Sequence, residues 1–158
     1  MKRRSTEAHD EQVHAAAWRL QFTLATRTPS GDPDSVIGAT VEHSVPIEEA
    51  LTGLLNILGP SHPLTSTVVQ AKCACADVSV LHESWVAYCA EQARSGTDDE
   101  TLAMDREFSS PGRVRDWPRY KTARRRTRTL TEQLAALEPQ LVSITGRDLA
   151  AHRQHGAA

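Results

Sequence analysis

The sequence predicts an all-α fold: a single-domain bundle of four to five helices, two of them long, amphipathic and antiparallel. Two stretches carry apolar residues at alternating spacings of three and four, which is typical of long helices with one buried face. Alanine occurs 21 times and arginine 15 times, and both residues favour helices. The 158 residues correspond to one domain, since domains average roughly 100–200 residues. We place the bundle at residues 1–146 and a weakly structured tail at residues 147–158.

The first expected helix spans residues 6–27, and either Ser5 or Thr6 can cap its start. Its apolar residues recur at helical spacing. A cluster of proline, glycine, serine and aspartate then predicts a loop at residues 28–35. The following segment, Val36–Val45, has β-branched residues without regular alternation, so we expect coil or a short extended segment there.

Two helices are expected in the middle of the chain. The first begins at Pro46, since proline suits a first helical turn, and ends before Gly59. The second runs from Leu64 to Arg94 without any breaker. Its predicted inward stripe consists of Leu64, Val68, Ala71, Cys75, Val78, His82, Trp85 and Cys89.

The last part of the chain predicts a short helix and a long one. A capping box opens a short acidic helix within residues 97–108. Residues 109–112 are a predicted turn, and Asp116 is the expected cap of a long helix that Gly146 closes. Pro139 lies inside this helix, where we expect a kink that keeps the same face inward. The predicted inward stripe consists of Tyr120, Ala123, Thr127, Leu130, Leu134, Leu137, Leu141 and Ile144.

The apolar stripes of these helices together predict the hydrophobic core. The expected core residues are Leu20, Leu24, Leu51, Leu54, Leu58, Val68, Val78, Trp85, Leu130, Leu134, Leu137 and Leu141. The chain lacks an unbroken apolar run of about 20 residues, the length of a membrane-spanning helix. We therefore expect a cytoplasmic protein without membrane contact, and its alanine and arginine content fits a bacterial or phage origin.

No catalytic or cofactor-binding motif occurs in the sequence. It has no Gly-x-Ser-x-Gly, no Gly-Lys-Ser/Thr phosphate loop, no Gly-x-Gly-x-x-Gly and no His-Glu-x-x-His. Cys73 and Cys75 would lie about 200° apart on a helix, and Cys89 is 14 residues beyond Cys75, so they cannot form one metal site within this helix; a site shared by two copies across a two-fold axis stays open as an alternative. We expect Cys75 and Cys89 to be small apolar core residues, and we expect no enzyme activity, cofactor or metal site.

The clearest pattern is the distribution of charge. Residues 113–128 contain eight basic residues and one acid, a net charge of +7, whereas the rest of the chain carries −9. An arginine-rich helix face can contact phosphates, and the neighbouring rings of Trp117 and Tyr120 can stack on bases. The candidate nucleic-acid-binding residues are Arg113, Arg115, Arg119, Tyr120, Lys121, Arg124, Arg125 and Arg128. Alternatively, this basic helix pairs with the acidic residues of segment 98–108, or is simply solvated.

A weaker candidate is a ligand pocket formed by His82, Trp85 and Tyr88. His82 is the one titratable group of an apolar stripe, where it either contacts a ligand or forms a buried hydrogen bond.

Three functions follow from these patterns. The leading hypothesis is a non-catalytic helical interaction module, a regulatory or accessory protein that binds a protein partner and self-associates as a homodimer. The alternative is a nucleic-acid-binding regulator that contacts phosphates through the arginine-rich helix 113–128. The third is a helical bundle that binds a small molecule.

Overall fold

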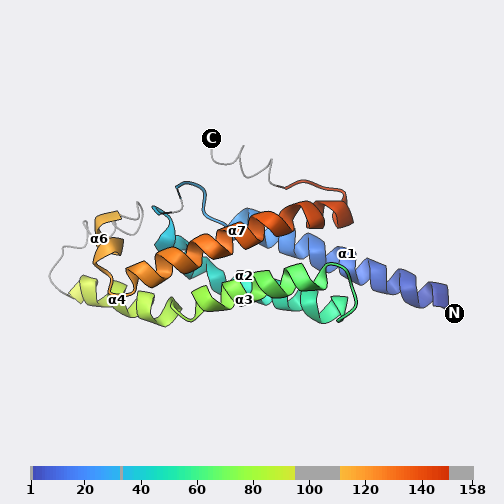
Figure 1. The fold of residues 1–158 in the computed structure, drawn as a ribbon, viewed down its shortest axis with the longest axis horizontal. Coiled ribbons are helices and arrows are strands. Elements are labelled where there is room, and N and C mark those ends of the chain that lie inside the picture. Colours follow the sequence, from blue (N-terminus) through green and yellow to red (C-terminus); the bar gives the residue numbers. More distant parts are fainter. Residues whose placement is uncertain (1, 33, 95–110, 150–158) are drawn as a thin grey trace.

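The computed structural model describes residues 2–32, 34–94 and 111–149, and every regular element within these ranges is a helix (Figure 1). The all-α prediction is therefore confirmed. The helices are α1 (Lys2–Arg27), α2 (Ile37–Leu58), α3 (Thr65–Ser79), α4 (His82–Arg94), α6 (Pro111–Asp116) and α7 (Tyr120–Thr145). None of them is at once long enough and apolar enough to cross a lipid bilayer.

Four helices, α1, α2, α3 and α7, form a single bundle in which consecutive helices run in opposite directions (Figure 1). Helix α2 packs against α1 and α3, and α7 closes the bundle against α3 and α1. Helix α4 extends beyond the end of α3, and the first turns of α1 project beyond the opposite end of the bundle (Figure 1). The expected antiparallel arrangement of the two long C-terminal elements is confirmed.

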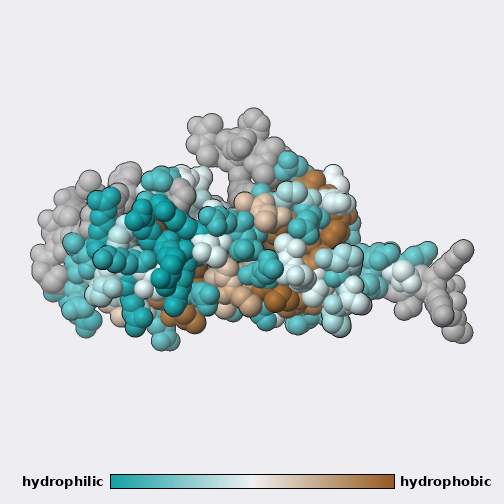
Figure 2. Space-filling view, viewed as in Figure 1, coloured by the Kyte–Doolittle hydropathy of each residue, from teal (hydrophilic) through white to brown (hydrophobic). Residues whose placement is uncertain are grey.

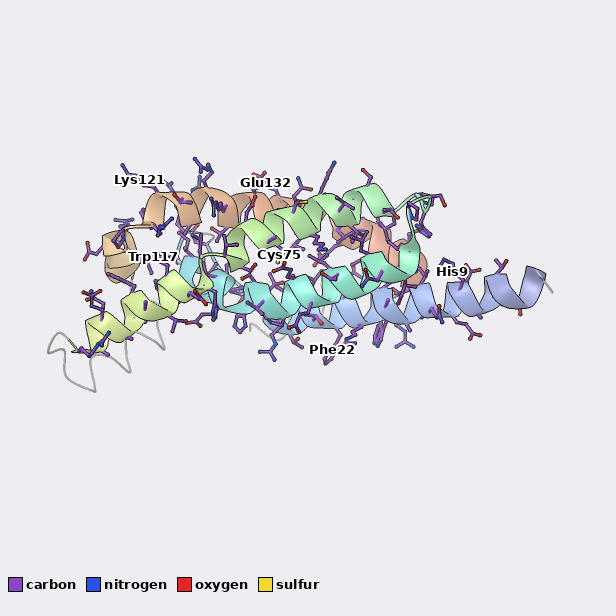
Figure 3. The ribbon with its side chains drawn as sticks, turned by 90° about the horizontal axis from the view of Figure 1, so that it is seen from below. His9, Phe22, Cys75, Trp117, Lys121 and Glu132 are labelled. Atoms are coloured by element: carbon purple, nitrogen blue, oxygen red, sulfur yellow. The ribbon has the colours of Figure 1, made fainter. Side chains whose placement is uncertain are left out.

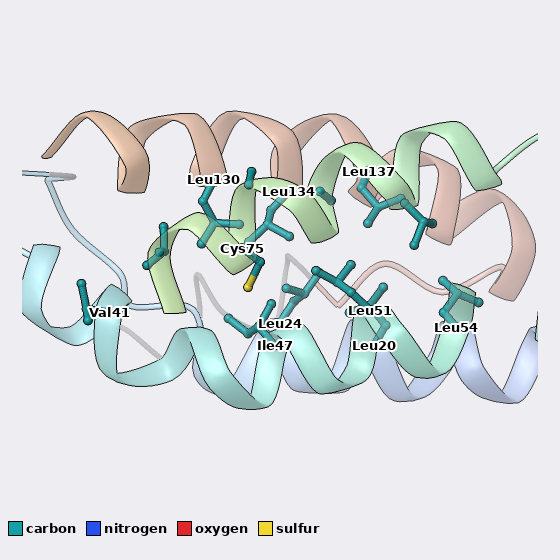
Figure 4. Packing of buried hydrophobic residues seen from close by; sticks show 14 of the residues in the cluster. Leu20, Leu24, Val41, Ile47, Leu51, Leu54, Cys75, Leu130, Leu134 and Leu137 are labelled. Carbon is teal, nitrogen blue, oxygen red and sulfur yellow. The ribbon is translucent and has the colours of Figure 1, made fainter. Parts of the chain in front are cut away.

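All twelve predicted core residues are buried. Leucines from α1, α2 and α7 point into one space between the helices, which they share with Cys75 of α3 (Figure 4). The burial of large apolar side chains along four helices supplies the main driving force for this fold.

The prediction of coil at Val36–Val45 was wrong, because α2 runs from Ile37 to Leu58 without interruption. Pro46 lies inside this helix instead of opening it. The buried stripe of α2 passes through the proline at helical spacing: Ile37, Val41, Ser44, Ile47, Leu51, Leu54 and Leu58. Packing along this stripe outweighs both the weak helix propensity of β-branched residues and the lost backbone hydrogen bond at the proline.

The predicted single helix from Leu64 to Arg94 was also wrong, because the chain turns at Val80 and Leu81 between α3 and α4. The Leu81 amide donates to the Val78 carbonyl at 3.0 Å, a contact one residue shorter than the α-helical one. No glycine or proline marks this turn. The predicted inward face is nevertheless kept, since Leu64, Val78 and Trp85 are all buried.

The long C-terminal helix begins later than expected. Asp116 ends the short helix α6 instead of capping α7, and the predicted turn at residues 109–112 is helical from Pro111 onward. The Tyr120 amide donates to the Trp117 carbonyl at 2.9 Å, and α7 starts there with no side-chain cap. A proline at position 118 disfavours the helical conformation at Trp117, which explains the turn between the two helices.

The rest of α7 follows the prediction. Its buried stripe keeps one face on both sides of Pro139, and Gly146 ends the helix in the left-handed conformation with φ 72°. Helix α1 also follows its prediction, except that it starts at Lys2, so neither Ser5 nor Thr6 caps it. The expected acidic helix within residues 97–108 lies outside the described residues.

Candidate functional site

Most of the described basic side chains of segment 115–128 form an exposed surface on the end of α6, the turn after it and the N-terminal half of α7. Hydrophilic side chains gather over this part of the bundle (Figure 2). The exposed cations with described side chains are Arg115, Arg119, Lys121, Arg124, Arg125 and Arg128, and we call this set the basic surface. Nothing is described of the Arg113 side chain, and Tyr120 is half-buried against the core instead of facing outward.

Two residues of the basic surface are held by one carboxylate from the loop between α1 and α2. Nε and a terminal nitrogen of Arg124 donate to the two carboxylate oxygens of Asp34 at 3.1 and 3.3 Å. A terminal nitrogen of Arg128, one helical turn later, donates to the same two oxygens at 3.0 and 3.1 Å. The loop is thereby tied to α7.

These contacts change the acid–base properties of the ion pair. The hydrogen bond from Arg124 is the main cause that holds the pKa of the Asp34 carboxyl below its ordinary value, and the charge of Arg128 acts in the same direction. The same hydrogen bond raises the pKa of Arg124. The sequence suggested pairing with segment 98–108, which lies outside the described residues; the observed partner, Asp34, was missed because it is 90 residues away from Arg124.

Of the other five described cations in segment 115–128, one donates to a backbone carbonyl and four make no ion pair or hydrogen bond with another described residue; we call these four the open cations. Arg126 is half-buried and donates to the backbone carbonyl of Asp77 at 2.9 Å. No ion pair or hydrogen bond with another described residue is found for the side chains of Arg115, Arg119, Lys121 and Arg125. Lys121 points away from the bundle (Figure 3).

The predicted aromatic pocket is filled by the protein's own side chains. The Trp85 ring lies on the backbone of Gly38 in α2, and its Nε1 donates to a Glu42 carboxylate oxygen at 3.1 Å. Its other face contacts Trp117 edge-on, with ring centroids 5.1 Å apart. Trp117 is only 2% exposed, so it cannot stack on bases as we expected.

Of the other two residues of the predicted pocket, Tyr88 stands beside Trp85 with ring centroids 6.0 Å apart. His82 is the first residue of α4 and is half-buried. The structure thus brings Trp85 and Tyr88 together, and the aromatic cluster also holds α4 against α2. The Nε1 of Trp117 adds a hydrogen bond to the Ser84 hydroxyl at 3.2 Å.

The cysteines are separated as predicted. Cys75 is fully buried, and its thiol donates to the Ser44 carbonyl at 3.2 Å. Burial raises the pKa of this thiol from an ordinary 9.0 to about 12, and the nearby Glu48 carboxylate acts in the same direction. Cys73 is exposed and Cys89 is half-buried. Within the described ranges, no three potential ligands are grouped to hold a metal ion.

A groove between α1 and α2 was not foreseen from the sequence. Two adjoining hollows of about 330 and 200 Å³ follow the two helices and share Arg19, Glu49 and Ala50 in their walls. Ala15, Ala16 and Gly53 line the larger hollow. Phe22 lines the smaller hollow and is 57% exposed. The available sequence signal was the run of three alanines at positions 15–17.

No family model, curated protein or solved structure matches this chain.

Proposed function

We propose that the protein is a non-catalytic helical interaction module of the cytoplasm, a regulatory or accessory protein that self-associates as a homodimer through the face formed by α1 and α2. The groove between these two helices is the observation that carries the proposal. It runs along the outside of the bundle, where α1 and α2 have no further helix of the described chain against them.

The groove has the properties of a helix-packing surface. Ala15, Ala16, Ala50 and Gly53 carry little or no side chain, so another helix can approach the backbone closely. Phe22 is 57% exposed, which leaves about 100 Å² of apolar ring in water. Covering that ring would contribute about 2–3 kcal/mol per copy at about 25 cal/mol per Å².

The charges in the groove favour a second copy of the same chain as its occupant. Arg19 of α1 and Glu49 of α2 line both hollows, and neither forms an ion pair with another described residue. A two-fold interface places the same patch on both copies, so an Arg19–Glu49 contact between the copies would form twice, and we propose that this contact is made. The groove therefore carries its own complementary charges.

A charge swap tests this interface. Light scattering is measured on the natural chain, on Arg19→Glu, on Glu49→Arg and on the double variant that carries both changes. Each single change sets like charges against each other across the two-fold axis and is expected to shift the dimer to monomer. The double variant restores opposite charges and is expected to restore the dimer.

Two controls separate the interface from general charge effects. Glu132→Arg makes the same change of charge as Glu49→Arg, but on α7, on the other side of the bundle from Phe22 (Figure 3). It is expected to leave the dimer intact. Circular dichroism should show unchanged helix content, because Arg19, Glu49 and Glu132 are all exposed. A dimer that survives both single changes, or a double variant that stays monomeric, would contradict the α1–α2 interface.

A further inference from the structure

We infer that the basic surface binds the phosphate backbone of duplex DNA. The surface is independent of the proposed dimer interface, because Lys121 and Phe22 point to opposite sides of the bundle (Figure 3). A dimer formed through α1 and α2 would therefore leave the basic surface of each copy open.

The basic surface carries an excess of positive charge. Segment 115–128 has seven cations whose side chains are described, and four described acids lie beside them: Asp116 in the same segment, Asp34, which holds Arg124 and Arg128, Asp32, whose charge acts on Arg124, and Asp77, whose backbone carbonyl binds Arg126. Among the described residues, three positive charges therefore remain in excess at this place, although the whole chain has a net charge of −2. A concentrated patch of this kind attracts a polyanion even when the protein as a whole is acidic.

The cations of the basic surface follow one helix. Lys121 and Arg125 are separated by one turn of α7, about 6 Å along the helix axis, and both are exposed. Arg124 and Arg128 flank them, with guanidinium groups held by Asp34. The helix thus presents a row of cations that can face a row of phosphates.

The inward position of the neighbouring aromatic rings favours duplex over single-stranded nucleic acid as the ligand. Proteins that hold single strands combine cations with exposed aromatic rings on which the bases stack. Here Trp117 is buried against Trp85, and Tyr120 packs against the core. With its neighbouring aromatic rings turned inward, the surface suits the regular phosphate rows of a duplex, which needs no stacking.

The test is fluorescence anisotropy with a labelled duplex DNA of about 25 base pairs and with labelled oligo-dT, over a series of salt concentrations. Four open cations predict a slope of log K against log salt of about −3 to −4, and so about a hundredfold weaker binding at 200 mM than at 50 mM salt. The double variant Lys121→Glu, Arg125→Glu is expected to weaken duplex binding at least tenfold at 50 mM salt. Asp34→Asn removes the carboxylate that holds Arg124 and Arg128 and is expected to strengthen duplex binding severalfold.

The matched control for Asp34→Asn is Glu11→Gln. It removes one negative charge near His9, at the end of the molecule opposite Lys121, and is expected to leave affinity unchanged (Figure 3). The inference is overturned if the natural chain does not bind the duplex at 50 mM salt. It is also overturned if oligo-dT binds more tightly, or if the double variant binds like the natural chain. Arg19→Glu tests the dimer interface, whereas the double variant Lys121→Glu, Arg125→Glu tests DNA binding, so either proposal can fail without the other.

Discussion

Replacement of Gly38 by alanine is the sharpest test of how α4 is held against the bundle. A Cβ atom at this position would lie 2.5 Å from Cζ2 of Trp85 and 3.0 and 3.1 Å from two further ring atoms. Carbon atoms in contact prefer about 3.5–4.0 Å, so the indole would have to retreat by about 1 Å. Its hydrogen bond to Glu42 and its contact with Trp117 oppose that movement.

The expected cost of Gly38→Ala follows from two opposing effects. Forcing an extra carbon into a packed site costs about 1–3 kcal/mol, and a weakened indole hydrogen bond adds about 0.5–1.5 kcal/mol. Replacing glycine by alanine within a helix returns up to about 1 kcal/mol. We therefore expect a loss of about 1–3 kcal/mol in the free energy of unfolding.

Urea unfolding followed by circular dichroism measures this change, and Gly53→Ala is the matched control in the same helix. Apart from its two chain neighbours and the nearby backbone of its own helix, no described atom lies within 4 Å of a Cβ at position 53, so alanine there should stabilise the chain by about 0.5–1 kcal/mol. Both variants are measured at a concentration low enough to keep the chain monomeric. If Gly38→Ala were as stable as the natural chain, the close packing of Trp85 on α2 would be refuted.

Three further predictions concern a buried hydrogen bond and the cysteines. Thr145→Val leaves the buried Gln21 amide oxygen without its 2.7 Å hydrogen bond and should cost about 1–3 kcal/mol in urea unfolding, whereas the exposed Thr129→Val should change stability by less than 0.5 kcal/mol. A thiol reagent should label Cys73 in the native protein but reach Cys75 only after unfolding. The pKa of the Cys75 thiol is about 12 in the folded chain and near 9.0 in the unfolded chain, so the free energy of unfolding should fall as pH rises between these values. Cys75→Ala should make that fall shallower. Equal slopes for the two proteins would contradict the raised pKa.

The fold could be predicted because hydrophobic spacing is a local property of the sequence. The stripe that includes Leu130 and Leu134 marks the buried face of α7, and Gly146 marks its end, without reference to any other helix. The errors occurred where tertiary contacts decide the conformation. Pro46 is tolerated inside α2 because the buried residues on both sides of it pack as one stripe against the other helices, which offsets the lost backbone hydrogen bond.

The candidate sites were less predictable, because each depends on residues far apart in the sequence. The arginine-rich segment was evident, but its partner Asp34 lies in a loop that only the folded bundle brings to α7. Trp117 was expected to be available for stacking, whereas the turn before α7 places it 2% exposed against Trp85. The groove between α1 and α2 is a property of two helices together, so neither helix alone predicts it.

The most direct test of the proposed function is the mass of the natural chain in solution, measured by sedimentation equilibrium over a wide range of concentrations. A self-associating module predicts a mass that rises with concentration to twice the chain mass of 17.3 kDa and then stays constant. A mass of 17.3 kDa at every concentration would contradict the homodimer.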